Sequence, residues 1–186
     1  MGKPHVCPWW MGYFLINPLR KLYQNPRRIL APYVHEGMKV VDYGCGMGFF
    51  SLPLAQLVGP EGKVFCVDLQ KKMINKLLQR ARRAHVEQII QVCLVSPGQW
   101  PLNKLVAEID FGLLFAVVHE IEDKEGLFLW CQRILRPKGR ILFAEPCAHV
   151  TQKDFAYSLN LAQKTGFIIG EEPSIRNTHA VILEKS

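Results

Sequence analysis

The part of the sequence best suited to chemistry is a glycine-rich loop flanked by acidic residues. Gly44, Gly46 and Gly48 alternate with other residues directly after an apolar run, and Asp42 stands two positions before the first of them. Glycines in a loop that opens a helix permit a tight turn and let a ligand approach bare backbone N–H groups. Asp68 ends the next apolar run, where a carboxylate is placed to accept both hydroxyls of a ribose. The pattern indicates a site for a ligand that contains a nucleoside.

The spacing of the glycines helps to decide whether this ligand is a dinucleotide or a nucleoside without a pyrophosphate. The dinucleotide fingerprint GxGxxG needs a glycine at its last position so that helix and strand can pack closely. Counted from Gly44, that position is Phe49, which is too bulky for this role. A carboxylate at Asp42 would repel a pyrophosphate, whereas it could hold an ammonium directly or through water. These features favour S-adenosylmethionine (SAM), which carries a ribose and an α-amino acid but no phosphate.

An alternation of strand and helix patterns must position these residues. Strands are predicted at 38–43, 63–68, 89–95, 109–117, 140–144, 167–171 and 179–184, and helices at 49–58, 71–85, 124–135 and 151–165. The segment 136–139, Arg-Pro-Lys-Gly, is predicted to be a turn. Such alternation is typical of a parallel sheet with helices on both faces, which binds ligands at the carboxyl ends of its strands.

Four motifs in this order resemble those of the class I SAM-dependent methyltransferases. Residues 41–48 are similar to the first motif of that family, and 67–68 to the second. Residues 110–120 resemble the fourth strand of small-molecule methyltransferases with a ubiquinone/menaquinone-biosynthesis-like domain, and 135–140 resemble the turn before their fifth strand. The resemblance implies an α/β, Rossmann-like sheet of seven strands in the order 3-2-1-4-5-7-6. The last strand would be antiparallel, with helices on both faces of the sheet.

The resemblance also implies a set of cofactor-binding residues at the ends of the strands. They are Asp42, Gly44, Cys45, Gly46, Asp68, Leu69, Ser96 and Ala116. The loop backbone would face the methionine part, Asp68 the ribose hydroxyls and Leu69 the adenine, while the Ala116 carbonyl would accept from the methionine ammonium. The acid that the family commonly places after the third strand is missing here, so Ser96, Gln99 or backbone must substitute for it.

His119 is the candidate catalytic residue. It follows the fourth strand, where acceptors meet the methyl group in the family that the chain resembles. A general base there would contribute roughly 100- to 10,000-fold, although an acidic acceptor such as a thiol or phenol needs little base. Alternatively, His119 is a structural residue of a helix-entry turn, with Glu120 as its partner. Glu145, which ends the fifth strand, is predicted to be an electrostatic or loop-holding residue rather than a base.

Residues 1–36 are predicted to be an N-terminal lid or arm, and 37–186 the SAM-dependent methyltransferase domain. The arm holds five prolines and an aromatic cluster, which indicate short helical pieces wrapped on a core. Trp9, Trp10 and Tyr13 are placed to roof an acceptor pocket, because aromatic side chains bury a large area at little entropic cost. Ordinary packing of the arm explains the cluster equally well.

The composition of the chain bears on its localisation and on whether it binds a membrane, a metal ion or a nucleic acid. With 49% hydrophobic and 21% charged residues, the chain is typical of a soluble globular protein. No apolar stretch approaches the roughly 20 residues of a transmembrane helix, and there is no secretory signal, so we expect a cytoplasmic protein. Its cysteines form no CxxC pair, so no metal site is predicted. The net charge of +7 comes from basic clusters without interleaved aromatics, which give no strong nucleic-acid signal.

We therefore expect SAM-dependent methyl transfer to a small-molecule acceptor. Two alternatives stay open. One is an RNA or protein methyltransferase that uses the basic clusters. The other is a module that binds SAM or NAD without catalysis. The sequence does not indicate the oligomeric state.

Overall fold

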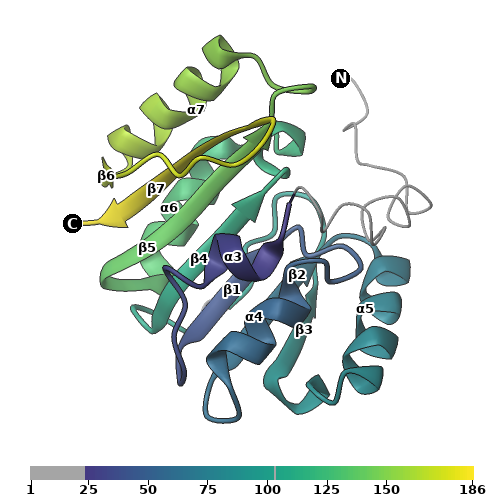
Figure 1. Cartoon of the computed structure of the whole chain (residues 1–186). Helices are drawn as coiled ribbons and strands as arrows, with labels where there is room; N and C mark the ends of the chain where they lie inside the picture. Colours follow the sequence, from purple (N-terminus) through teal and green to yellow (C-terminus); the bar gives the residue numbers. More distant parts are fainter. Residues whose placement is uncertain (1–23, 103) are drawn as a thin grey trace. The chain divides into compact units, whose positions relative to one another are not determined.

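The computed structural model describes residues 24–102 and 104–186 (Figure 1). Over these residues the chain forms one seven-stranded sheet of order β3-β2-β1-β4-β5-β7-β6, which confirms the predicted fold class. The strands are Lys39–Tyr43 (β1), Lys63–Asp68 (β2), Ile90–Leu94 (β3), Ile109–Phe115 (β4), Leu135–Pro146 (β5), Phe167–Ile169 (β6) and Thr178–Lys185 (β7). The α-helices are Pro26–Leu30 (α3), Ser51–Val58 (α4), Lys71–Arg83 (α5), Lys124–Ile134 (α6) and Gln152–Lys164 (α7).

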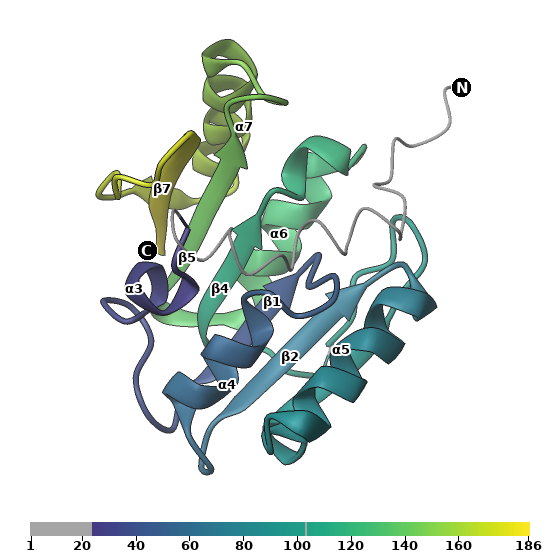
Figure 2. The ribbon, with the colours of Figure 1, turned by 45° about the vertical axis from the view of Figure 1, so that its right-hand side comes forward.

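The described residues fall into two compact units, the N-terminal unit up to residue 97 and the C-terminal unit from 98 onward. In the N-terminal unit, β1 pairs with β2 and β2 with β3, all in parallel. The middle residues 64–67 of β2 are all buried, as expected for a parallel strand covered on both faces. Because both crossovers run in the same direction and are right-handed, α4 and α5 lie on the same side of these strands (Figure 2).

Helix α5 shows how the sequence pattern produces this packing. The helical spacing of Met73, Ile74, Leu77 and Leu78 predicts that these four residues face inward. The first three are buried and Leu78 is half-buried. The opposite face carries lysines and arginines, of which Arg82 forms an exposed ion pair with Glu87 at 3.5 Å. Exposed pairs of this kind contribute little to stability. The buried apolar stripe is therefore what fixes α5 against the strands.

In the C-terminal unit, β4 pairs with β5 in parallel, and β7 pairs antiparallel with both β5 and β6. The last strand of the chain was predicted to be antiparallel, and β7 confirms this. The segment 136–139 is different from the prediction, because it belongs to β5 rather than forming a turn before it. Ile109 pairs with Leu135 and Phe111 with Arg140, so the intervening residues of β5 bulge out of register. Lys138 adopts a left-handed φ of 61° within this bulge.

The predicted lid residues Trp9, Trp10 and Tyr13 lie outside the described residues. The rest of the arm begins with α3, a short helical piece of the predicted kind, which Asn25 caps by accepting from two backbone N–H groups. Leu30 and Val34 are buried, so this part of the arm packs into the N-terminal unit. The boundary at residue 36 stays a prediction. None of the described helices is long and apolar enough to cross a membrane.

Candidate functional site

The glycine loop, residues 44–48, joins β1 to α4 in the N-terminal unit. Gly44, Gly46 and Gly48 have φ values of 76°, 52° and 80°, a region that side chains other than glycine rarely adopt. A Cβ on Gly48 would lie 2.7 Å from Leu52 Cδ1 and 3.0 Å from Leu77 Cγ, whereas one on Gly46 would meet nothing within 4 Å. Gly48 is therefore required by packing as well as by backbone conformation. Gly46 keeps its backbone open to an approaching ligand.

Asp68 connects β2 to this loop through its carboxylate. The N–H of Gly46 donates to Asp68 Oδ2 at 2.8 Å, and the N–H of Gln70 donates to Oδ1 at 2.8 Å. A carboxylate has about four acceptor positions, so capacity remains for a ligand hydroxyl beside these backbone bonds. Burial raises the pKa of Asp68, while hydrogen bonds from the backbone N–H groups of Gln70, Gly46 and Leu69 lower it. A carboxylate anchored in this way beside the glycine loop fits a ligand hydroxyl such as those of the SAM ribose.

Asp42 lies beneath the loop rather than at its surface. Its side chain is 3% exposed, and Ser51 Oγ donates to Asp42 Oδ2 at 2.5 Å. Burial raises the pKa of Asp42 to about 7; the Ser51 bond lowers it and the nearby Asp68 charge raises it further. Ser51 is a partner that the sequence pattern did not reveal. The predicted contact between Asp42 and a ligand ammonium stays a prediction.

A second unpredicted contact holds the loop from α5. Arg80 donates from its guanidinium to the carbonyl of Met47, inside the glycine loop. Burial lowers the pKa of Arg80. Arg80 stands three positions after Leu77, on the same helix face. From the sequence, Arg80 was counted with the other bases on the outer face of α5; the spacing from Leu77 is the signal that could have separated it from them.

The remaining predicted cofactor residues differ in exposure. Cys45 is buried, and burial raises the pKa of its thiol. Leu69 is half-buried and Ser96 is exposed. Ala116, in the C-terminal unit, directly follows β4; it has a left-handed φ of 56° and donates its N–H to the Ala144 carbonyl at 2.8 Å. Such a conformation is uncommon for a residue with a side chain, and it turns the chain sharply where β4 ends.

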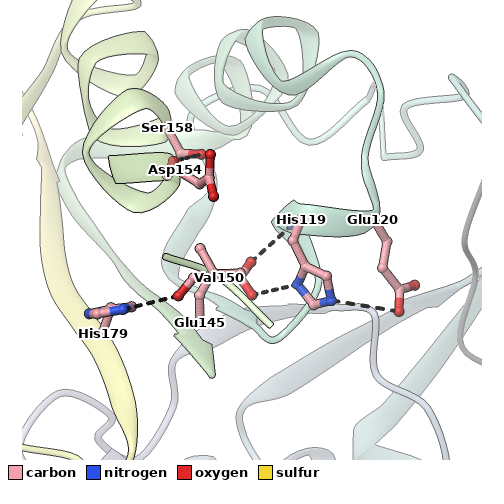
Figure 3. A network of polar contacts seen from close by, with 7 residues as sticks. All are labelled: His119, Glu120, Glu145, Val150, Asp154, Ser158 and His179. Carbon is pink, nitrogen blue, oxygen red and sulfur yellow. Dashed lines mark hydrogen bonds and ion pairs between the residues drawn. The ribbon is translucent and has the colours of Figure 1, made fainter. Parts of the chain in front are cut away.

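His119 follows β4 in the short 3-10 turn Val118–Glu120 and is bound twice by Glu145, from the end of β5 (Figure 3). The backbone N–H of His119 donates to Glu145 Oε1 at 3.1 Å, and His119 Nδ1 lies 2.6 Å from Glu145 Oε2. Glu145 is 1% exposed. Because a carboxylate accepts, Nδ1 carries the proton and the neutral ring has Nε2 as its acceptor. Glu145 thus holds the loop, as predicted, and also orients the imidazole.

The charges around His119 favour its protonated form. The hydrogen bond to Glu145 raises the pKa of His119, burial opposes it, and the charges of Glu145 and Glu120 add to the rise. Glu120 Oε1 lies 4.0 Å from Nε2, which is consistent with the predicted partnership of these neighbours. Lys124 lowers the pKa of His119 through its positive charge. The ring therefore becomes a neutral acceptor only at a pH above its ordinary 6.5.

A cavity of about 360 Å³ opens beside this pair, entirely within the C-terminal unit; we call it the histidine pocket. It is lined by His119, Lys124, Glu145, His149, Val150, Asp154, Tyr157 and Ser158. His149 stacks on His119, with ring centroids 6.0 Å apart and planes 5° apart. Asp154, Tyr157 and Ser158 come from α7, and nothing in their sequence spacing linked them to His119. In the part of the chain that the structure describes, no cluster of His, Cys, Asp and Glu is suited to a metal ion.

Residues 34–179 match the sequence model of a methyltransferase domain. The chain belongs to the class I SAM-dependent methyltransferases, enzymes whose cofactor is SAM. A SAM-dependent methyltransferase from Aquifex aeolicus has the same fold, with a TM-score of 0.86 at 20% identity over 97% of this chain and 100% of that one. Family membership decides between SAM and NAD in favour of SAM, in agreement with the argument from Phe49.

Relatives of this family have several activities. The chain is 28% identical over 148 residues to a ubiquinone/menaquinone biosynthesis C-methyltransferase (UbiE) of Hahella chejuensis, covering 75% of this chain and 57% of the relative. It is 31% identical over 121 residues to an arsenite methyltransferase of Halobacterium salinarum, covering 65% and 30%. A ubiquinone biosynthesis O-methyltransferase of Methylocella silvestris is 27% identical over 189 residues, covering 92% and 68%. The chain thus spans 57% of the UbiE relative and less of the arsenite enzyme.

Proposed function

We propose that the chain transfers a methyl group from SAM to a small-molecule acceptor, with the cofactor at the glycine loop and the acceptor in the histidine pocket. The observation that carries the proposal is the anchored carboxylate of Asp68, held by the Gly46 N–H beside three left-handed glycines. When bound, SAM supplies a methyl group on a positively charged sulfur, which is a strong electrophile. The work left to the protein is to orient the acceptor and to remove its proton where that is needed.

His119 is proposed as the residue that removes the proton. Glu145 fixes Nδ1 as the donor, so Nε2 of the neutral ring is the acceptor. The same division of roles makes histidine a general base in hydrolases that pair it with a buried carboxylate. The Ala116 carbonyl and residues Leu69 and Ser96 remain proposed cofactor contacts, and the arm with Trp9, Trp10 and Tyr13 remains a proposed lid.

The small-molecule acceptor is favoured by the size of the pocket. A cavity of about 360 Å³ lies near the lower end of the roughly 300–1,000 Å³ typical of small-molecule sites. The runner-up, RNA or protein methylation, rests on the exposed basic face of α5, whose first turn holds no acidic residue. That face is also what an ordinary solvated helix presents, so it is the weaker argument.

The experiment is a labelled-methyl screen. The full chain is incubated with SAM carrying a labelled methyl group and a metabolite extract, and separately with total RNA and with protein. We expect label in low-molecular-weight products, identified by mass spectrometry, and none in the macromolecules. An Asp68→Ala variant serves as the matched control and, at a SAM concentration near the wild-type Kd, should label these products far less. Label confined to RNA or protein would replace the proposal with the runner-up.

A further inference from the structure

Most of the residues that line the histidine pocket are of polar or ionisable type. Seven of its eight lining side chains are polar or ionisable, and Val150 is the exception. Most sites for small ligands are instead lined mainly by apolar side chains with a few polar groups. A long apolar acceptor would bury its hydrocarbon against groups that lose their water without gaining hydrogen bonds, which is costly. The lining therefore indicates a compact polar ligand.

The carboxylates of the pocket already make contacts within the protein. Both oxygens of Glu145 interact with His119. Asp154 sits in the first turn of α7, and its Oδ2 accepts from Thr151 Oγ1 at 2.6 Å, beside the cap of the helix. A carboxylate in that first turn is also stabilised by the helix dipole. Both oxygens of Glu145 are therefore occupied, and the charge of Asp154 already stabilises its own helix.

Lys124 is the opposite case. It opens α6, where the helix dipole disfavours a positive charge, so local helix stability does not explain a lysine here. Its side chain lines the pocket and is half-buried. Among the residues that the structure describes, it makes no hydrogen bond and no ion pair. A half-buried ammonium without a carboxylate is the feature that an anionic ligand would complete.

The two sides of the pocket together define the ligand. His119 Nε2 presents an acceptor for a hydroxyl, and Lys124 presents an ammonium for an anion. We propose that the pocket takes a compact hydroxy acid, whose hydroxyl donates to His119 Nε2 while its anionic group pairs with Lys124. This inference rests on the proposed function and names its acceptor class. In the reaction, the hydroxyl oxygen bonds to the methyl carbon and its proton goes to His119 Nε2, while the electron pair of the broken S–C bond stays on sulfur.

Binding of 2-, 3- and 4-hydroxybenzoate to the full chain tests the proposal, with their methyl esters as neutral matched ligands. Calorimetry is run with and without S-adenosylhomocysteine, and methyl transfer is followed on the same samples. We expect at least one hydroxybenzoate to bind tenfold or more tightly than its ester. Lys124→Gln should remove that preference and leave the affinity for the ester unchanged. Lys153→Gln, an exposed lysine of α7 outside the pocket, should bind both as the wild type does.

Three results would overturn the inference. The first is equal binding of acid and ester by the wild type, and the second is an unchanged preference in Lys124→Gln. The third is a wild type that binds none of the three acids. SAM affinity, measured on the same preparations, separates this failure from failure of the proposed function: a chain that binds SAM and labels other small molecules keeps the function and loses only the acceptor class.

Discussion

The glycine loop and the histidine pocket are built on different principles. The loop presents backbone: its positive φ values, the exposed Gly44 and the Gly46 N–H bound to Asp68 all depend on residues at two adjacent strand ends. The pocket presents side chains, brought together from the end of β4, the end of β5, the start of α6 and one face of α7. Backbone geometry tolerates few sequences, whereas a wall of side chains can be changed one residue at a time.

This difference explains why the sequence of the chain identifies its cofactor but not its methyl acceptor. A ligand held by a left-handed loop and one carboxylate imposes the same motif on every relative that binds it. An acceptor is selected by the lining of a pocket, so relatives of one family act on different molecules. The names of the relatives, which include C-, O- and arsenite methyltransferases, agree with this division. The following predictions separate the two regions.

The largest effect is expected from His119→Ala. If Nε2 removes the acceptor proton, turnover should fall by roughly 100- to 10,000-fold while SAM affinity stays at the wild-type value. Steady-state kinetics and calorimetry on the same variant measure both quantities. His85→Ala, an exposed histidine of the N-terminal unit, is the matched control. Full turnover in His119→Ala would return His119 to a structural role.

Glu145→Gln tests the role of His119 through the pH dependence of turnover. The neutral ring is the active form, so wild-type turnover should rise with pH through a midpoint above 6.5 and then level off. Removing the Glu145 charge removes the main cause of the raised pKa, so the midpoint should move to lower pH. The plateau should also fall, by about tenfold or more, because the ring is no longer held in one tautomer. An unchanged midpoint would show that the rise of turnover with pH reports the titration of a group other than His119.

Arg80→Met tests the support of the glycine loop. Without the bond to the Met47 carbonyl, the loop should be less ordered before SAM binds, and affinity should fall several-fold. Arg80→Lys should recover part of the loss. Arg83→Met, on the exposed face of the same helix, should bind SAM normally. Calorimetry measures affinity, and hydrogen exchange at residues 44–48 of the free protein measures the order of the loop.

The smallest effect concerns stability at Asp42. Its pKa is about 7 in the folded protein and 3.8 when unperturbed, so the folded state holds the proton over a range in which the unfolded chain has lost it. This group therefore lowers stability progressively as pH rises from about 4 to about 7. Asp42→Asn cannot ionise and should melt above the wild type at pH 8, with little difference at pH 4. A difference independent of pH would contradict the burial argument.

Much of the N-terminal unit could be predicted from its sequence. β2 was predicted with the bounds that the structure has, and the inward face of α5 followed from the spacing of Met73, Ile74 and Leu77. Both features follow from patterns of apolar residues within one short segment of the sequence. The bulge in β5 was missed because a Pro-Lys-Gly stretch has the composition of a turn, and only pairing with Ile109 and Phe111 shows that the strand continues on both sides of it.

The pocket could be predicted only in part. His119 was singled out because it comes shortly after a strand, and Glu145 because it lies at the end of one. Their contact joins residues 26 positions apart, and sequence periodicity carries no information about such a pair. The same holds for Tyr157, which is 62% exposed and has no pattern that separates it from a surface residue. Tertiary placement, rather than local propensity, creates this part of the site.

The most direct test of the account is a calorimetric titration of SAM into the wild type and into Asp68→Ala. The side chain of Asp68 is anchored by backbone N–H groups and lies beside the glycine loop, and these two properties define the proposed cofactor site. The account predicts saturable binding with one SAM per chain, weakened by about tenfold or more in the variant. Equal affinity in the two proteins, or no binding by the wild type, would contradict it.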